Sequence, residues 1–456
     1  MNEPLITMTH VCRSWRNALL STPSLWTQID FSTYESKQAE GFLNRSGEQL
    51  LDIYQAFISE EDTEPFLSTT LPNTHRLQRL EIASYLPDLE SVLKRFTRPA
   101  PELECLEITN AIDITDRDMG FHSTIFEGRF PKLLSLSLHW LHMNLPSFSF
   151  PSLKRFNFMT GTNIPVERLT SFLERHPLLE YIQISVPCVV VGLPAPPRKR
   201  VQLDALKELR FNELACSSGL LNHLSLPKCT EVVLEGLFTG AEFDDNGCPA
   251  ARVHPSSIDH LPVTRGITKA VAMPISCILS GPGGNLRFWC FRGTRENFDA
   301  EFFTSFSPIS VSEIRELWVG HRDRSSTSPR PWEQTPAGVR GAFGVLTKVE
   351  DLTIVNCDTM PFFSTLGATV DGGVLLPRLR KLTIYVGRGD LDVSALIQCA
   401  EARKEHFQPI GEVVVVFEDE PEGDFVEGAQ LLRAFVGGLI YRVGQAPRTT
   451  WDGGEY

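Results

Sequence analysis

The chain has 456 residues, of which 42% are hydrophobic and 22% charged, and its formal net charge is −13. This balance of apolar and charged residues is typical of a folded globular protein rather than a disordered one. The negative charge argues against a nucleic-acid binder and against a binder of anionic membranes, because both need a basic surface. No apolar run reaches the roughly 18 residues of a membrane-spanning helix, so no membrane partner is expected.

The ten cysteines contain no C-x-x-C pair and follow no regular spacing. Such cysteines are typical of small buried side chains in a reducing compartment, which predicts a cytoplasmic and/or nuclear location. The opening residues, MNEPLITMTHVCRSWR, lack a basic start followed by an apolar run. No signal peptide is therefore expected.

Residues 1–31 are expected to form a short helical segment. Apolar residues recur at helical spacing over LITMTHVCRSWRNALL, with arginines and an asparagine on the opposite face. Pro23 ends this helix, and SLWTQIDF then reads as a turn into a strand. From composition alone, the segment is an amphipathic cap that covers the first strand of the main fold.

The order of residues within this segment adds a resemblance. The run V-C-R-x-W-R followed by A-L-x-T-P-x-L-W resembles the second half of an F-box, notably in the large fungal, basidiomycete-type family of F-box proteins with leucine-rich-like repeats. In that family the F-box docks onto a Skp-type adaptor and thereby onto a cullin ubiquitin ligase. The resemblance implies this role for the F-box-like residues Val11, Cys12, Trp15, Arg16, Pro23, Leu25 and Trp26.

The chain departs from the family pattern at its start. The family's F-box opens with a Leu-Pro-x-Glu-hydrophobic helix, where this sequence has only Glu3, Pro4, Leu5 and Ile6. Two alternatives stay open: the gene encodes further residues upstream, or part of the adaptor-binding face has been lost.

A helix over Ser36–Asn44 is expected to end near Ser46-Gly47, because glycine readily takes the left-handed conformation that ends a helix. The first strand follows at Leu50–Tyr54. The same order of helix, RSG and strand follows the F-box in the fungal family.

One apolar pattern, at positions i, i+3 and i+5, recurs through the rest of the chain. PRLRKLTIY, with Leu379, Leu382 and Ile384, is its clearest copy. Its last two apolar residues are two apart, as in a strand with one buried face. Such a short strand cannot bury that face alone, so the copies must stack. The copies are about 28 residues apart, within the range of leucine-rich repeats, and start at Leu77, Leu103, Leu133, Leu153, Leu179, Leu206, Cys229, Ile258, Leu286, Ile314, Val349, Leu379 and Ile410.

These observations predict an α/β fold, an irregular leucine-rich-repeat-like solenoid over residues 32–420. Parallel strands would line its concave face and helices or loops its convex face. The Asn or Cys that regularises such repeats is mostly missing and clearly present only at Cys357, so another repeat family is an alternative. Segments 191–202 and 321–341 read as loops. EGAQLLRAFVGGLIYRV predicts a C-terminal capping helix within 421–444, and residues 445–456 a disordered tail.

Each candidate enzyme or metal-binding motif in the sequence is incomplete. SGPGGN (Ser280–Asn285) lacks the spacing and the lysine of phosphate-binding loops and reads as a turn. Asp244–Gly247 lacks the later ligands of a calcium loop. Cys248, His254 and His260 are spaced too loosely for zinc. No catalytic centre, cofactor or metal site is therefore expected.

A protein-binding surface is the better hypothesis. The residues that alternate with the buried positions of each strand should face outward, and mixed charge with exposed aromatics suits protein recognition. A register error of one residue would turn any of them inward. The chain would then be a non-catalytic substrate-recognition subunit, or alternatively a ligase-independent repeat scaffold. The predicted target-binding residues are Arg155, Tyr181, Arg210, Phe288, Arg292, Trp318 and Tyr385.

Overall fold

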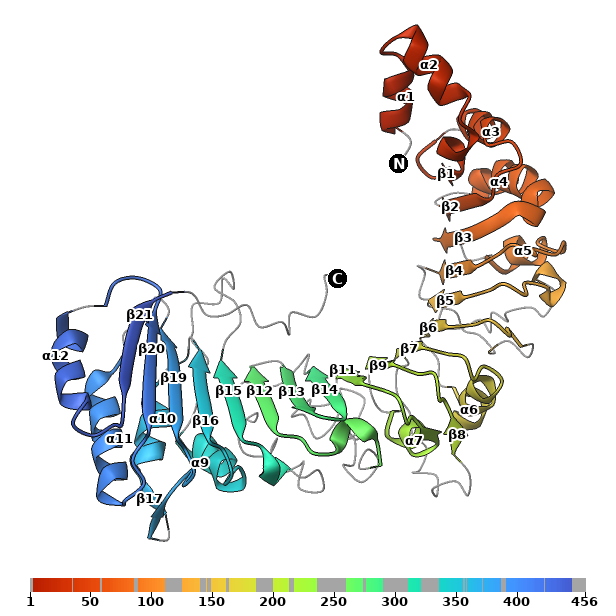
Figure 1. Ribbon diagram of the computed structural model, residues 1–456. Coiled ribbons are helices and arrows are strands. Elements are labelled where there is room, and N and C mark those ends of the chain that lie inside the picture. Colours follow the sequence, from red (N-terminus) through yellow and green to blue (C-terminus); the bar gives the residue numbers. More distant parts are fainter. Residues whose placement is uncertain are drawn as a thin grey trace. The chain divides into compact units, whose positions relative to one another are not determined.

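A computed structural model describes residues 3–34, 36–57, 60–85, 89–110, 125–139, 145, 149–160, 164–185, 200–212, 217–235, 260–273, 276–289, 311–320, 336–355, 357, 359–370, 372–386, 391–421 and 423–444. The chain divides into two compact units, Met1–Cys229 and Thr230–Tyr456. Each unit combines helices with a mostly parallel sheet, so the predicted α/β class is confirmed (Figure 1).

The first unit begins with two short helices and continues as strands that alternate with helices or turns. Its helices are α1 (Glu3–Thr9), α2 (Arg13–Leu20), α3 (Ser36–Arg45), α4 (Thr63–Thr70), α5 (Leu89–Lys94), α6 (Val166–Glu174) and α7 (Ser217–Asn222), with 3₁₀ turns η1 (Pro23–Trp26), η2 (Glu60–Asp62), η3 (Leu71–Arg76) and η4 (Ile125–Gly128). Its strands are β1 (Gln28–Asp30), β2 (Leu51–Phe57), β3 (Leu77–Ser84), β4 (Cys105–Asn110), β5 (Ser135–His139), β6 (Arg155–Met159), β7 (Tyr181–Ser185), β8 (Val201–Gln202), β9 (Glu208–Asn212) and β10 (Leu224–Ser225).

The strands β1 to β7 and β9 pair in parallel in chain order. The register aligns the same pattern position of each repeat, and these side chains are buried. Stacking thus hides the apolar face that one short strand cannot bury alone. The aligned buried row is Leu80, Leu106, Leu136, Phe156, Ile182 and Leu209.

Aromatic rings connect the repeats behind this sheet. Phe66 lies 6.2 Å from Phe96, measured between ring centroids, and Phe96 lies 5.3 Å from Phe126. The contacts continue to Phe150, which stacks on His176 at 5.4 Å. Ring contacts of this kind stabilise a fold beyond the area that they bury. The chain of contacts runs Phe66, Phe96, Phe126, Phe130, Phe150, His176, Phe172 and Phe156.

The second unit repeats the parallel arrangement after an antiparallel interruption. Its strands are β11 (Glu231–Glu235), β12 (Lys269–Met273), β13 (Ser276–Gly281), β14 (Gly284–Trp289), β15 (Glu316–Gly320), β16 (Asp351–Val355), β17 (Thr369–Val370), β18 (Gly373–Val374), β19 (Lys381–Val386), β20 (Glu412–Phe417) and β21 (Leu439–Val443). Its helices are α9 (Pro336–Val345), α10 (Met360–Gly367), α11 (Val393–Glu405) and α12 (Gly423–Leu432), with 3₁₀ turns η6 (Pro262–Thr264) and η7 (Val311–Glu313).

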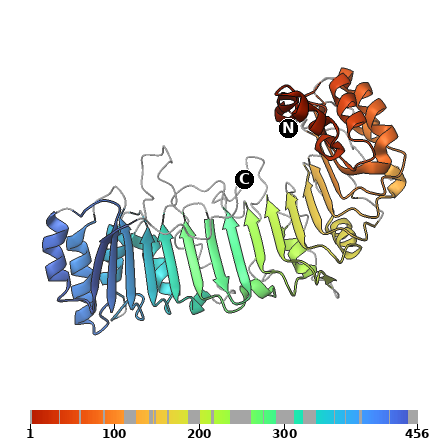
Figure 2. The ribbon, with the colours of Figure 1, turned by 45° about the horizontal axis from the view of Figure 1, so that its top comes forward.

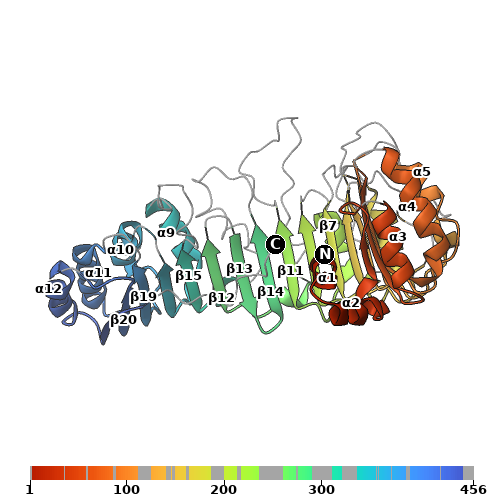
Figure 3. The same cartoon turned by 90° about the horizontal axis from the view of Figure 1, so that it is seen from above.

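The main sheet of this unit has the order β11-β14-β13-β12-β15-β16-β19-β20-β21. The pairs β14–β13 and β13–β12 are antiparallel, and the others are parallel. The successive strands can be followed in Figure 2. Helices α9 to α12 pack in chain order and lie on one side of the strands β15 to β20 (Figure 3).

The predicted turn Ser280–Asn285 is confirmed and joins β13 to β14. A side-chain carbon on Gly283 would lie 1.9 Å from the carbonyl oxygen of Pro262, and one on Gly284 would lie 2.2 Å from that of Thr230. Gly284 also has φ of +122°, which favours glycine. The clustered glycines thus allow the backbone of this turn to lie close to the backbones of Pro262 and Thr230.

Most predicted strands are confirmed, since in ten repeats the strand begins two residues after the first apolar position. Gly47, with φ of +55°, takes the predicted left-handed conformation just after α3. Ile258 lies outside the described residues. The loop predicted over 321–341 is wrong from Pro336 onward, where α9 begins.

The predicted C-terminal capping helix is wrong in its second half. α12 ends at Leu432, and Leu439–Val443 forms β21, which pairs with β20. Gly437 and Gly438 separate the two elements and weaken a continuous helix. The tail from residue 445 lies outside the described residues.

Candidate functional site

The outward face of the first unit's sheet carries two aligned rows of mostly polar side chains. The strands expose every second residue, as period-2 alternation requires. Parallel pairing then places corresponding residues side by side. The first row is Asp52, Arg79, Cys105, Ser135, Arg155, Tyr181 and Glu208; the second is Tyr54, Glu81, Glu107, Ser137, Asn157, Gln183 and Arg210. Asp52 and Tyr54 were missed as surface residues, although the alternation of Leu51 to Tyr54 signals them.

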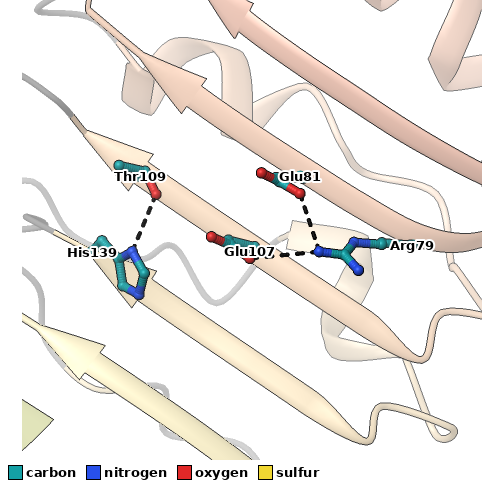
Figure 4. Close-up of polar contacts among 5 residues, drawn as sticks. All are labelled: Arg79, Glu81, Glu107, Thr109 and His139. Atoms are coloured by element: carbon teal, nitrogen blue, oxygen red, sulfur yellow. Dashed lines mark hydrogen bonds and ion pairs between the residues drawn. The ribbon is translucent and has the colours of Figure 1, made fainter. Parts of the chain in front are cut away.

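One guanidinium lies among carboxylates from two strands (Figure 4). A nitrogen of Arg79 is 3.2 Å from a carboxylate oxygen of Glu81 and 4.0 Å from one of Glu107. Partial burial raises the pKa of Glu81, and the nearby Glu107 adds to this rise while Arg79 opposes it. Burial likewise raises the pKa of Asp52, against the effect of Arg79. The cluster thus combines the carboxyl groups of Asp52, Glu81 and Glu107 with the single guanidinium of Arg79.

His139 ends β5 beside this cluster. Its Nδ1 lies 3.4 Å from the hydroxyl of Thr109 (Figure 4). Burial lowers the pKa of His139, while Asn157 and Glu81 act in the opposite direction. The imidazole is therefore held more strongly in its neutral form than a free histidine.

Three of the predicted target-binding residues lie close together on β6, β7 and β9. Arg155 is opposite Tyr181 in the register, and its guanidinium carbon lies 5.9 Å from the centroid of the tyrosine ring. The Tyr181 hydroxyl donates a hydrogen bond to Gln183 at 2.6 Å. Arg210 pairs with Glu208 at 2.5 Å. The face therefore changes from an acidic group on β2 to β4 to arginine and tyrosine on β6 to β9.

In the second unit, Trp318 and Tyr385 lie on β15 and β19 and are partly exposed. The Trp318 indole N–H donates to Glu316 at 2.6 Å. Lys269 forms an ion pair with the same carboxylate at 2.7 Å and lies 5.1 Å from the centroid of the Trp318 ring. The structure thus fixes Trp318 within a small charged cluster.

The prediction that Phe288 faces outward is wrong. Its side chain is 1% exposed, and β14 instead turns Leu286 and Phe288 inward. Arg287 lies between them and pairs with Glu231 at 3.0 Å. The glycine turn starts β14 earlier than the sequence pattern indicated, and a shift of one residue reverses the faces of a strand. Arg292 lies outside the described residues.

The N-terminal helices leave their apolar side chains exposed. The sequence indicated one helix, but Cys12 interrupts it and caps α2, its sulfur accepting a hydrogen bond from the backbone N–H of Trp15. Trp15 is 50% exposed and Val11 64% exposed, and Met8 and Leu20 are also exposed. No residue of α2 is buried, so the prediction of a cap with its apolar face covered is wrong for this helix.

The other predicted F-box-like residues are divided between surface and core. Arg16 is exposed and donates from Nε to the carbonyl of Thr9 at 2.8 Å, which holds α2 to α1. Pro23 begins η1 and is exposed, whereas Leu25 is partly buried. Trp26 is 2% exposed and stacks on Phe42, with ring centroids 5.5 Å apart.

The residues that the structure describes were compared with the requirements of a metal site and of a membrane-spanning helix. Within those ranges, no group of three His, Cys, Asp or Glu side chains is placed to hold a metal ion. The described part of the chain also contains no helix with the length and apolar character needed to cross a membrane. Cys248, His254 and residues 244–247 lie outside the described residues.

Comparison with known proteins gives no match, either to a protein-family model or to a curated protein.

Proposed function

We propose that this chain is a non-catalytic substrate-recognition subunit of an SCF-type cullin ubiquitin ligase. In this proposal, α1 and α2 dock onto a Skp-type adaptor in the cytoplasm or nucleus. The two sheets are stretches of an irregular leucine-rich-repeat-like solenoid whose outward rows bind a target protein. The subunit would accelerate ubiquitin transfer by holding its target near a charged partner, through effective concentration alone.

The observation that carries the proposal is that Trp15 and Val11 are exposed whereas Trp26, in the same F-box-like segment, is buried. Tryptophan is strongly favoured at the centres of protein interfaces, and a half-exposed one is costly to leave in water. A helix that only capped the sheet would bury its apolar face instead. The exposed residues coincide with the segment that resembles an F-box.

The outward rows support the second half of the proposal. Arg155, Tyr181 and Arg210 combine cationic and aromatic side chains, which supply much of the energy in protein interfaces. Because these residues come from separate strands of one sheet, their spacing is fixed before a target binds, and preorganisation reduces the entropic cost of binding.

The test is binding of the purified full chain to a Skp-type adaptor by titration calorimetry. Trp15→Ala should weaken binding by about 30-fold or more, as expected for an interface hot spot. Tyr85→Ala is the matched control, because Tyr85 is equally exposed, at 53%, but lies at the end of β3. Failure of both this chain and a version extended upstream by genomic sequence to bind the adaptor would reject the ligase role. The alternative, a ligase-independent scaffold, would then stand.

A further inference from the structure

The last strand that the structure describes, β21, has one edge to which no other described strand pairs. β21 runs parallel to β20, with Leu439 beside Val413, Tyr441 beside Val415 and Val443 beside Phe417 (Figure 1). Among the described residues, β20 is the strand that pairs with it, and no strand pairs with its other edge. The element expected to close this end of the unit therefore extends the sheet instead.

The hydrogen bonds between β20 and β21 show which backbone groups of β21 are not bonded to β20. The N–H of Val413 donates to the carbonyl of Gly438, and the N–H of Gly444 donates to that of Phe417, both at 2.8 Å. Alternate residues of a parallel strand bond to the same neighbour. Ile440 and Arg442 therefore also face β20. Leu439, Tyr441 and Val443 direct their N–H and C=O groups away from the sheet.

The side chains around this edge are apolar and exposed. Ile440 is 48% exposed and Val443 53% exposed, and Tyr441 is exposed although it contacts Phe425 of α12 at 5.4 Å. Val426 and Leu431, also on α12, are exposed as well. Exposed edge strands usually carry lysine, proline or an inward-pointing charge that blocks pairing. β21 has none of these, and Arg442 is its one charged residue.

We propose that β21 pairs antiparallel with the β21 of a second copy of this chain and forms a two-fold symmetric dimer. The edge-facing residues are the first, third and fifth of the strand, an arrangement symmetric about Tyr441. Turning one copy by 180° places Tyr441 opposite its own equivalent, and Leu439 of each copy opposite Val443 of the other. All three pairs are then hydrogen-bonded pairs of an antiparallel ladder.

The same register improves the packing of the exposed side chains. Leu439, Tyr441 and Val443 share the face of Val413 and Val415, which are buried. In the dimer the equivalent residues of both copies lie on that one face and cover one another. On the opposite face, Ile440 of each copy lies beside Arg442 of the other, whose aliphatic stem can cover it. Self-complementary pairing of this kind is typical of two-fold interfaces. The proposal does not depend on binding to an adaptor.

The first experiment measures the mass of the full chain by light scattering over a range of concentrations, with a dimer as the expected result. Tyr441→Pro should lower self-association by at least tenfold. Because the N–H of Tyr441 faces the open edge, proline there leaves the bonds to β20 in place. Val443→Pro acts through the same geometry without removing the ring that contacts Phe425. Tyr441→Phe keeps the N–H and should remain dimeric.

The second experiment tests the register by disulfide formation. In a hydrogen-bonded antiparallel pair the Cα atoms are about 5.5 Å apart, within the range that a disulfide spans. Tyr441→Cys should therefore give a covalent dimer under mild oxidation, beyond the background of the parent chain. The equivalent atoms at position 443 would be roughly 14 Å apart, so Val443→Cys should not cross-link.

A parent chain that is monomeric at every concentration would overturn the proposal. So would a dimer that persists in both proline variants, or cross-linking of Val443→Cys as efficient as that of Tyr441→Cys.

Discussion

The indole N–H of Trp26 donates a hydrogen bond to the backbone carbonyl of Leu19, with 2.9 Å between nitrogen and oxygen. Leu19 lies in the last turn of α2, and its carbonyl also accepts from the backbone N–H of Thr22 at 3.2 Å. The bond therefore ties the exposed N-terminal helices to a buried side chain of the first unit. Of the two tryptophans in the F-box-like segment, Trp26 holds the structure and Trp15 remains available to a partner.

This division predicts opposite consequences for the two tryptophans. Trp26→Ala should lower the free energy of unfolding of the first unit by about 3–5 kcal/mol, because it creates a cavity beside Phe42 and removes the bond to Leu19. Trp15→Ala should cost less than about 1 kcal/mol, since half of that side chain is already in water. Urea titrations of both variants would compare them directly. Equal losses would contradict the assignment of separate roles.

His176 should make the first unit less stable in acid. The N–H of Phe150 can only donate, so Nε2 of His176 accepts from it at 3.0 Å; the carbonyl of Phe172 can only accept, so Nδ1 donates to it at 2.7 Å. Because Nε2 must accept a hydrogen bond, the two bonds can form together only on the neutral ring with its proton on Nδ1. Burial lowers the pKa of His176, the positive charge of Arg175 lowers it further, and the bond to Phe172 opposes the shift.

The lowered pKa of His176 determines how the stability of the first unit depends on pH. A folded-state pKa below the unfolded value of about 6.5 contributes stability that is complete above pH 6.5 and is lost as pH falls through the folded-state pKa. The parent should therefore lose up to about 1.4 kcal/mol per pH unit from this group in that window. His176→Gln should be less stable at pH 7.5, with a difference from the parent that shrinks toward pH 5. A difference that is independent of pH would contradict the neutral-ring assignment.

Arg403 of α11 should be required for the second unit to fold. Its side chain is fully buried, and its guanidinium donates to the carbonyls of Leu375 at 2.7 Å and Leu376 at 2.9 Å. Arg403→Ala would remove the donor to these two carbonyls, of which that of Leu376 is buried, and create a cavity, for a loss of at least about 3 kcal/mol. The adjacent Lys404→Ala is the control, because the bond of Lys404 to Ala434 is exposed and should cost less than about 1 kcal/mol. Thermal unfolding would separate the two, and similar melting temperatures would refute the prediction.

Glycine substitutions should separate the close-packed turn from an ordinary helical position. Gly284→Ala would force a methyl group to within 2.2 Å of the Thr230 carbonyl at φ of +122°, and should lower the yield of folded protein or its stability by several kcal/mol. Gly344→Ala in α9 meets nothing within 4 Å and should stabilise by about 0.5–1 kcal/mol. The midpoint of denaturation should therefore fall for Gly284→Ala and rise for Gly344→Ala. A neutral Gly284→Ala would show that the turn can move.

Local patterns in the sequence were sufficient to predict where most strands lie. The spacing of Leu103, Leu106 and Ile108 is repeated so often that it fixes both the strand and its buried face, because a short strand has only one way to hide two apolar residues. Gly47 and Pro23 mark the end of α3 and the start of η1 for equally local reasons, the left-handed backbone of one and the fixed φ of the other.

Phe288 and the C-terminal strand show where local patterns fail. The face of Phe288 depends on where β14 begins, which is decided by the packing of Gly283 against the backbone of Pro262. Leu439–Val443 has enough apolar residues for a helix or a strand, and the open edge of β20 decides in favour of the strand. Contacts with residues distant in sequence override local preference in both places.

The amino-acid sequence by itself determined the α/β class, the repeated strands and the positions of Arg155, Tyr181 and Arg210 on one face, because period-2 alternation and repeat spacing are local properties. Only the tertiary structure decided that Trp26 is buried while Trp15 is exposed, that Phe288 points inward, and that β21 has one edge to which no other described strand pairs. The physical reason is that burial depends on which surfaces meet in space, and an apolar residue looks the same in sequence whether it packs in a core or awaits a partner.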